Sequence, residues 1–137
     1  MRVLVIDGQG GGLGKQLVSS LKGLDSVCLT AVGTNSLATS AMVKAGASEA
    51  ATGENAVLVA CRRADVIVGA VGIVVADALL GEITPAMAAA VGACSAKKIL
   101  IPMNKCDTIV CGCEGKTLSA CVAEAAERIK ALAGSRP

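Results

Sequence analysis

The chain has 137 residues, of which 53% are hydrophobic, and its formal net charge is +2. This length suits a single domain with a substantial core. The sequence contains no Phe, Tyr, Trp or His, which excludes imidazole and phenol groups as proton donors, bases or metal ligands, and leaves no ring to stack on a nucleotide base. The small charge and the lack of a basic cluster argue against a nucleic-acid partner.

The sequence pattern also argues against a membrane protein. The charge-free apolar stretches 66–76 and 83–95 are too short, and too rich in glycine and small residues, to span a bilayer. A strand pattern begins at the N-terminus, so we expect no signal peptide and a cytoplasmic location. The seven cysteines are then expected to be thiols.

Short apolar runs alternate with helical patterns along the chain. Segment 73–80 is ambiguous by period, and we favour a helix because Asp77 would otherwise lie inside a buried strand. Thr84 and Pro85 form a good helix start. The expected strands are 3–6, 27–32, 48–51, 66–69 and 98–102, with a possible sixth at 108–111. The expected helices are 14–21, 37–45, 54–63, 73–80, 85–92 and 117–132.

This alternation predicts an α/β fold. Several strands are continuous apolar runs, which is typical of a sheet covered on both faces. We therefore expect a three-layer Rossmann-like sandwich whose mostly parallel sheet has the order 3-2-1-4-5. Residues 1–133 are expected to form one Rossmann-like nucleotide-binding domain, and 134–137 a flexible tail.

The most informative motif follows the first strand. Five glycines occupy seven positions in the run VIDGQGGGLGK, and a helix pattern follows directly. A glycine-rich turn between a strand and a helix is the construction that holds a phosphate against exposed backbone amides. Close packing of helix on sheet is the alternative reason for glycines here, and Lys15 is as consistent with a solvated position as with a phosphate contact.

In an open parallel sheet, ligands bind where the strand order reverses, which here is between the first and fourth strands. The predicted cofactor-binding residues are Gly8, Gln9, Gly10, Gly11, Gly12, Leu13, Gly14, Lys15, Thr34, Asn35, Gly69 and Gly72.

The spacing of the turn matches one known template. The patterns G-x-G-x-x-G and G-x-x-x-x-G-K-[ST] both fail, whereas Gly8, Gly12 and Gly14 fit G-x-x-x-G-x-G. This turn resembles the phosphate turn of short-chain dehydrogenases/reductases, and the resemblance implies NAD(P) binding there. It implies no catalysis, because the Tyr-x-x-x-Lys pair of those enzymes has no counterpart. Polar residues 34–36 stand where a carboxylate would favour an unphosphorylated ribose, so the base and cofactor stay open.

A second resemblance covers almost the whole chain. The runs VIDGQGGGLGKQLV, AVGTNSLATSAM, AATGENAV and ADALLGEITPAMAAAVG resemble a family of small bacterial proteins, largely from anaerobes, catalogued as domain of unknown function 3842. The resemblance implies a cytoplasmic bacterial setting. It implies no activity, ligand or catalytic residue, and it does not include the cysteine-rich stretch 106–113.

Four carboxylates are candidates for chemistry near the turn. Asp7 either meets a ligand or holds the turn by hydrogen bonds, and Glu54 is best interpreted as a first-turn dipole partner. Asp77 and Glu82 are able to act as acid and base or to hold a divalent metal. We favour capping and solvation for these two, because carboxylates near helix starts are common.

The cysteines at 106, 111 and 113, with Cys121 further on, have the spacing C-x₄-C-x-C. This matches neither the plant-type iron–sulfur pattern nor the C-x₂-C pairs of zinc sites. We therefore assign no metal-binding residues from this spacing. Whether the four thiols bind a metal ion stays an open question at this point.

These observations favour a binding or regulatory module for NAD(P) or another adenine nucleotide. One alternative is a small reductase or nucleotide-processing hydrolase that uses Asp, Glu or Lys, with unknown catalytic residues. Another is a structural homo-oligomeric subunit without a ligand. The abundance of Ala, Val and Leu with modest charge predicts a homo-oligomer in each case.

Overall fold

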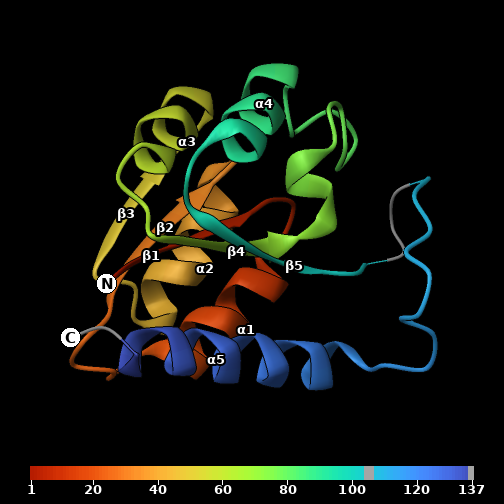
Figure 1. Ribbon diagram of the computed structural model, residues 1–137. Helices are drawn as coiled ribbons and strands as arrows, with labels where there is room; N and C mark the ends of the chain where they lie inside the picture. The colour runs from red at the N-terminus through yellow and green to blue at the C-terminus, as the bar shows by residue number, and fades with distance from the viewer. Residues whose placement is uncertain (104–106, 136–137) are drawn as a thin grey trace.

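The computed structural model describes residues 1–103 and 107–135, and it confirms the predicted α/β sandwich. A five-stranded parallel sheet has the order β3-β2-β1-β4-β5 (Figure 1). The strands are β1 (Arg2–Asp7), β2 (Cys28–Gly33), β3 (Glu49–Thr52), β4 (Val66–Ala70) and β5 (Lys97–Ile101). The helices are α1 (Gly12–Leu21), α2 (Ser36–Ala45), α3 (Glu54–Cys61), α4 (Pro85–Ala93) and α5 (Leu118–Gly134), with a 3₁₀ helix η1 (Val71–Val74).

Helices cover the sheet on both faces. Figure 1 shows α1, α2 and α5 on one face and α3 and α4 on the other. Along β1, Val3 and Val5 point into the first layer, whereas Leu4 and Ile6 point into the second, because successive strand residues face opposite sides. All four are almost fully buried, which explains why this strand is a continuous apolar run.

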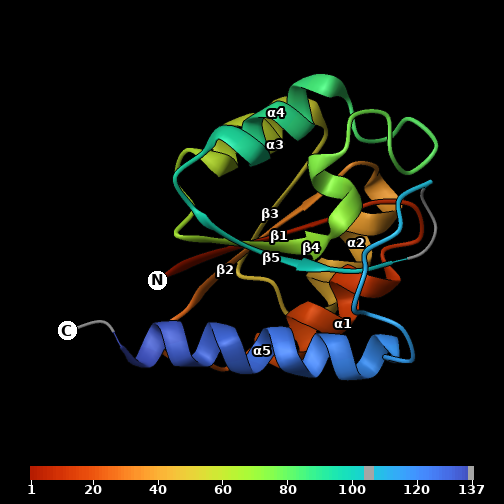
Figure 2. The same ribbon diagram turned by 45° about the vertical axis from the view of Figure 1, so that its right-hand side comes forward.

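The carboxyl ends of β1 and β4 lie side by side at the reversal of strand order. The chain leaves β1 through the glycine turn into α1 on one face, and leaves β4 through η1 toward α4 on the other. Residues 107–117, which precede α5, pass the same end of the sheet (Figure 2). At this end the glycine turn shares a pocket with Leu79, with Met103 after β5 and with Leu118 at the start of α5.

Three local predictions differ from the structure. Segment 73–80 is not an α-helix: residues 73–74 end η1, and the rest makes tight turns, in which Asp77, Leu79 and Leu80 have φ values of 64°, 55° and 55°. Residues 108–111 form no strand, so β5 is an edge of the sheet. Helix α5 extends through Gly134 and ends on Ser135, while residues 136–137 of the predicted tail lie outside the described residues.

Within the described ranges, no helix has both the length and the apolar character needed to cross a membrane.

Candidate ligand site at the glycine turn

A pocket of about 270 Å³ opens at the carboxyl ends of β1 and β4. The glycine turn forms one side of it, and apolar side chains from distant segments form the other. Its lining residues are Asp7, Gly8, Gln9, Gly10, Gly11, Gly12, Leu13, Gln16, Ala70, Gly72, Leu79, Met103 and Leu118.

Asp7 is the buried carboxylate that shapes the turn. Its two oxygens accept hydrogen bonds from the amides of Gly8 at 2.8 Å and Gly14 at 2.7 Å. Burial raises the pKa of Asp7; the two amides counteract part of this effect, and the charge of Glu82 adds to it. Of the two roles considered for Asp7, the structure shows the one in which it holds the turn.

Glu82 ties the turn to two other segments. Its carboxylate accepts hydrogen bonds from the Gln9 amide at 3.1–3.2 Å, from Thr34 Oγ1 at 3.0 Å and from Asn35 Nδ2 at 2.6 Å. Burial works to raise the pKa of Glu82, but these three donors together outweigh it and leave the pKa below its ordinary value. The capping and solvation that we favoured for Glu82 therefore does not describe its role.

The backbone amides of the turn divide into two groups. Several donate hydrogen bonds to Asp7, to Glu82 or to a carbonyl of the turn itself. Across the described part of the chain, the amides of Gly10, Gly12 and Leu13 find no acceptor. Gly12 and Leu13 begin α1, where unpaired N–H groups and the helix dipole favour an anion. The pocket wall therefore carries three free donors.

Three glycines of the turn are required by close packing. A Cβ at Gly14 would lie 2.5 Å from Met42 Sδ, and one at Gly11 would lie 2.8 Å from the Ala38 Cα atom. Gly11 also has a φ of 75°, which disfavours other residues. Gly8 is similarly crowded, with a neighbouring side-chain oxygen 2.7 Å from an added Cβ. These glycines serve the packing of α1 against α2 and the sheet.

Gly10 and Gly12 differ from the other three. A Cβ added at either position would meet no atom within 4 Å. Packing therefore gives no reason for glycine at these two positions, and both face open space beside the free amides.

The predicted cofactor-binding residues separate in the structure. Residues 8–13 and Gly72 line the pocket, whereas Gly14 lies behind the turn and Lys15 is exposed on α1. Thr34 and Asn35 reach the site through Glu82, and Asn35 also donates to the Gln9 carbonyl at 3.0 Å. Gly69 lies within β4, where a Cβ would approach the Ile6 carbonyl oxygen to 2.6 Å.

The apolar wall was not found from the sequence. Leu79, Met103 and Leu118 come from three segments that meet only in the folded chain. The apolar character of each residue was visible, but no local signal indicated that the three lie together.

The remaining candidates lie elsewhere. Glu54 is in the first turn of α3, and the Asp77 backbone bonds within its own loop. No group of three or more His, Cys, Asp or Glu residues in the described ranges is arranged to hold a metal ion. Cys106 lies outside those ranges, so the complete cysteine set cannot be placed.

Comparison with known proteins gives a family and a fold. The model of the family described as Domain of unknown function (DUF3842) matches residues 2–134. The chain belongs to this family. No curated protein matches it. The predicted resemblance of the turn to the phosphate turn of short-chain dehydrogenases/reductases is not confirmed by these comparisons and stays a prediction.

The fold of this chain is similar to that of a solved structure. It is a dodecameric FMN-dependent Ubix-like decarboxylase from Escherichia coli O157:H7, with 16% sequence identity and a TM-score of 0.50. The match covers 100% of this chain and 96% of that one.

This neighbour corrects the predicted function. We expected a binding or regulatory module for NAD(P) or another adenine nucleotide. The comparison contradicts this prediction, which is therefore wrong. The protein with the similar fold depends on FMN, a nucleotide that contains no adenine. It is also a decarboxylase and therefore an enzyme.

Proposed function

We propose that this protein binds FMN at the glycine turn, as a subunit of a homo-oligomer. The observation that carries the proposal is the set of three free amides, of Gly10, Gly12 and Leu13, in the wall of a pocket at the reversal of strand order. Free amides at a helix N-terminus are a general phosphate site. The FMN dependence of the structural neighbour supports a flavin as the molecule that carries the phosphate.

The residues present fit the two ends of FMN. The free amides suit the phosphate, and the apolar side chains of Leu79, Met103 and Leu118 suit a flat ring in the absence of aromatic residues. The pocket is smaller than the roughly 300–1,000 Å³ of most small-molecule sites, so part of the ring would lie outside it. A bound flavin supplies electron-transfer chemistry of its own.

The described residues that line the pocket offer no positively charged side chain to a phosphate. None of them is a lysine or arginine, and Asp7 is the one ionisable group. Asp7 is engaged in holding the turn. The phosphate would therefore be held by backbone donors and the helix dipole, in a site that already contains a carboxylate.

A homo-oligomer is supported by exposed apolar residues close to the pocket. Leu80, next to the pocket residue Leu79, is 98% exposed, and Ile109 is 89% exposed. Residues 75–80 and 107–108 line one surface hollow, so the segments that carry these two side chains are adjacent. The neighbour's dodecameric state is consistent with burial of such a surface between copies.

The test compares FMN with riboflavin, which lacks the phosphate, by fluorescence anisotropy titration. We expect FMN to bind at least about tenfold more tightly, since charge-assisted hydrogen bonds are the strong ones. Gly12→Asp should abolish the preference, because it adds a carboxylate beside the free amides at a position where an added Cβ would meet no atom within 4 Å. Gly92→Asp adds the same charge at an equally open, exposed glycine of α4 and should bind FMN normally. Equal binding of riboflavin, or normal binding by Gly12→Asp, would contradict the proposal.

A further inference from the structure

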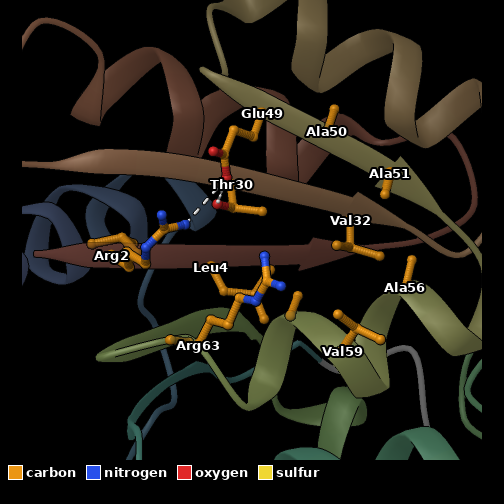
Figure 3. A pocket seen from close by; sticks show the side chains of 13 residues that line it. Arg2, Leu4, Thr30, Val32, Glu49, Ala50, Ala51, Ala56, Val59 and Arg63 are labelled. Carbon is orange, nitrogen blue, oxygen red and sulfur yellow. Dashed lines mark hydrogen bonds and ion pairs between the residues drawn. The ribbon is translucent and has the colours of Figure 1, made fainter.

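A second pocket lies on the other side of the sheet and shares no lining residue with the first. It is a groove of about 220 Å³ between α3 and the face formed by β1, β2 and β3 (Figure 3). Leu4, Val32 and Ala51 contribute from the three strands; the register places Val32 directly opposite Ala51, and Leu4 opposite Thr30. Ala56 and Val59 of α3 form the opposite wall. The groove is apolar over most of its length.

Charged residues gather near one end of the groove. There, the Glu49 carboxylate accepts a hydrogen bond from Thr30 Oγ1 at 3.1 Å and pairs with Arg2 Nη1 at 3.4 Å. Arg63, two residues beyond α3, extends into the groove toward Leu4 in Figure 3. In the ranges that the structure describes, its guanidinium has no hydrogen-bond or ion-pair partner. Among the residues that line the groove, Arg2, Glu49 and Arg63 sum to a net charge of +1.

The charged residues at this end of the groove indicate the charge of the ligand group that it would bind. Glu49 already neutralises Arg2, so one guanidinium with a planar set of N–H donors remains for a single negative group. A guanidinium binds a carboxylate through two parallel hydrogen bonds. The alanines at 51 and 56 leave room beside the sheet for an unbranched hydrocarbon chain, whose burial is favourable.

We propose that this groove binds a linear aliphatic carboxylate, with the carboxylate on Arg63 and the hydrocarbon chain along Ala51, Ala56 and Val59, above the buried side chains of Leu4 and Val32. The site is independent of the FMN site, because the two pockets have separate linings. A doubly charged group fits less well, since Glu49 lies at the same end and would repel the second charge.

The experiment titrates the protein with octanoate and with octanol while the methyl signals of Leu and Val are followed by NMR. We expect octanoate to shift the signals of Leu4, Val32 and Val59, and to bind about tenfold more tightly than octanol. Signals of Leu79 and Leu118, in the FMN pocket, should not move.

Two variants identify the contacts. Arg63→Gln should weaken octanoate binding about tenfold and leave octanol binding unchanged. Arg62→Gln removes an adjacent exposed arginine that does not line the groove and should bind octanoate normally. Ala56→Leu fills the groove while Arg63 stays, and should reduce binding of both compounds. Equal binding of octanol and octanoate, no effect of Arg63→Gln, or shifts confined to other methyl groups would overturn the proposal.

Discussion

Asp7 holds the glycine turn through both of its carboxylate oxygens, one on the Gly8 amide and one on the Gly14 amide. Asp7→Asn keeps the size of the side chain but leaves one acceptor oxygen. One of two buried amides then lacks a partner, and the free energy of unfolding should fall by about 1–3 kcal/mol. Urea denaturation measures this loss, and an unchanged midpoint would show that Asp7 does not hold the turn.

The raised pKa of Asp7 gives this residue a characteristic pH dependence. Burial is the largest cause of the increase from the ordinary value of 3.8. An acid whose pKa is higher in the folded state than in the unfolded state favours folding when it is protonated. Its contribution to stability falls as pH rises from the unfolded-state pKa to the folded-state pKa, and it does not change further above that range. The stability advantage of the wild type over Asp7→Asn should therefore be fully present at and below about pH 3.8 and shrink as pH rises through the pKa of Asp7 in the folded state. Unfolding curves at several pH values test this, and an advantage that grows with pH would contradict it.

Gly12 and Gly14 lie two positions apart but should respond differently to a methyl group. Gly14→Ala meets Met42 Sδ and Asp7 Cβ at 2.5 and 2.8 Å, and should cost about 1–3 kcal/mol by overpacking. Gly12→Ala meets nothing and replaces a poor helix former, so stability should rise by up to about 1 kcal/mol. The two denaturation midpoints should move in opposite directions; a similar loss in both would mean that the whole turn serves packing.

At the scale of elements, Asn35 connects the start of α2 with the turn and with the loop after η1. Its Oδ1 caps α2 on the Ala38 amide at 2.9 Å, while its Nδ2 donates to Glu82 and to the Gln9 carbonyl. Asn35→Asp keeps the cap but sets a carboxylate against Glu82. Combination with Glu82→Gln should restore a donor–acceptor pair, with a coupling energy of about 0.5–3 kcal/mol in a double-mutant cycle. Additive effects would show that the contact between the two side chains carries no energy.

Elements whose signals are local could be predicted from the sequence. Strands β1 and β4 are short apolar runs rich in β-branched residues, and glycines mark the turn that follows β1. The segment 73–80 could not be predicted, because apolar spacing suggested a helix while Glu82 fixes the loop through residues of two other segments. Leu79 and Leu80 have positive φ values, a conformation that leucine rarely adopts, so local preference does not predict this loop.

The same distinction applies to the site. The glycine turn was predicted because five glycines after a strand form a local pattern, but their division into packing glycines and open glycines depends on Ala38 and Met42 of α2. The apolar wall and the role of Glu82 come from contacts between distant segments. The position of the turn could therefore be predicted from the sequence, and its use as a ligand site stays a proposal. The predicted adenine nucleotide was wrong.

For the molecule as a whole, the proposed assembly places Leu80 and Ile109 between copies. Both side chains are almost fully exposed in the single chain, so replacing them with glutamate should not disturb its core. The double variant Leu80→Glu, Ile109→Glu is expected to be smaller than the wild type in size-exclusion chromatography with light scattering, because charges at an apolar contact oppose association. Leu37→Glu, at an exposed position of α2, is the control for added surface charge. A wild-type mass for the double variant would place the interface elsewhere.

The central claim is that three amides of the glycine turn are free to hold a phosphate. Two-dimensional ¹H–¹⁵N NMR with FMN and riboflavin tests it directly. FMN should shift the amide signals of Gly10, Gly12 and Leu13 downfield, whereas Gly14, whose amide is bonded to Asp7, should move little. Riboflavin should not produce the downfield shifts. Unmoved signals at all three residues in the presence of saturating FMN would contradict the account.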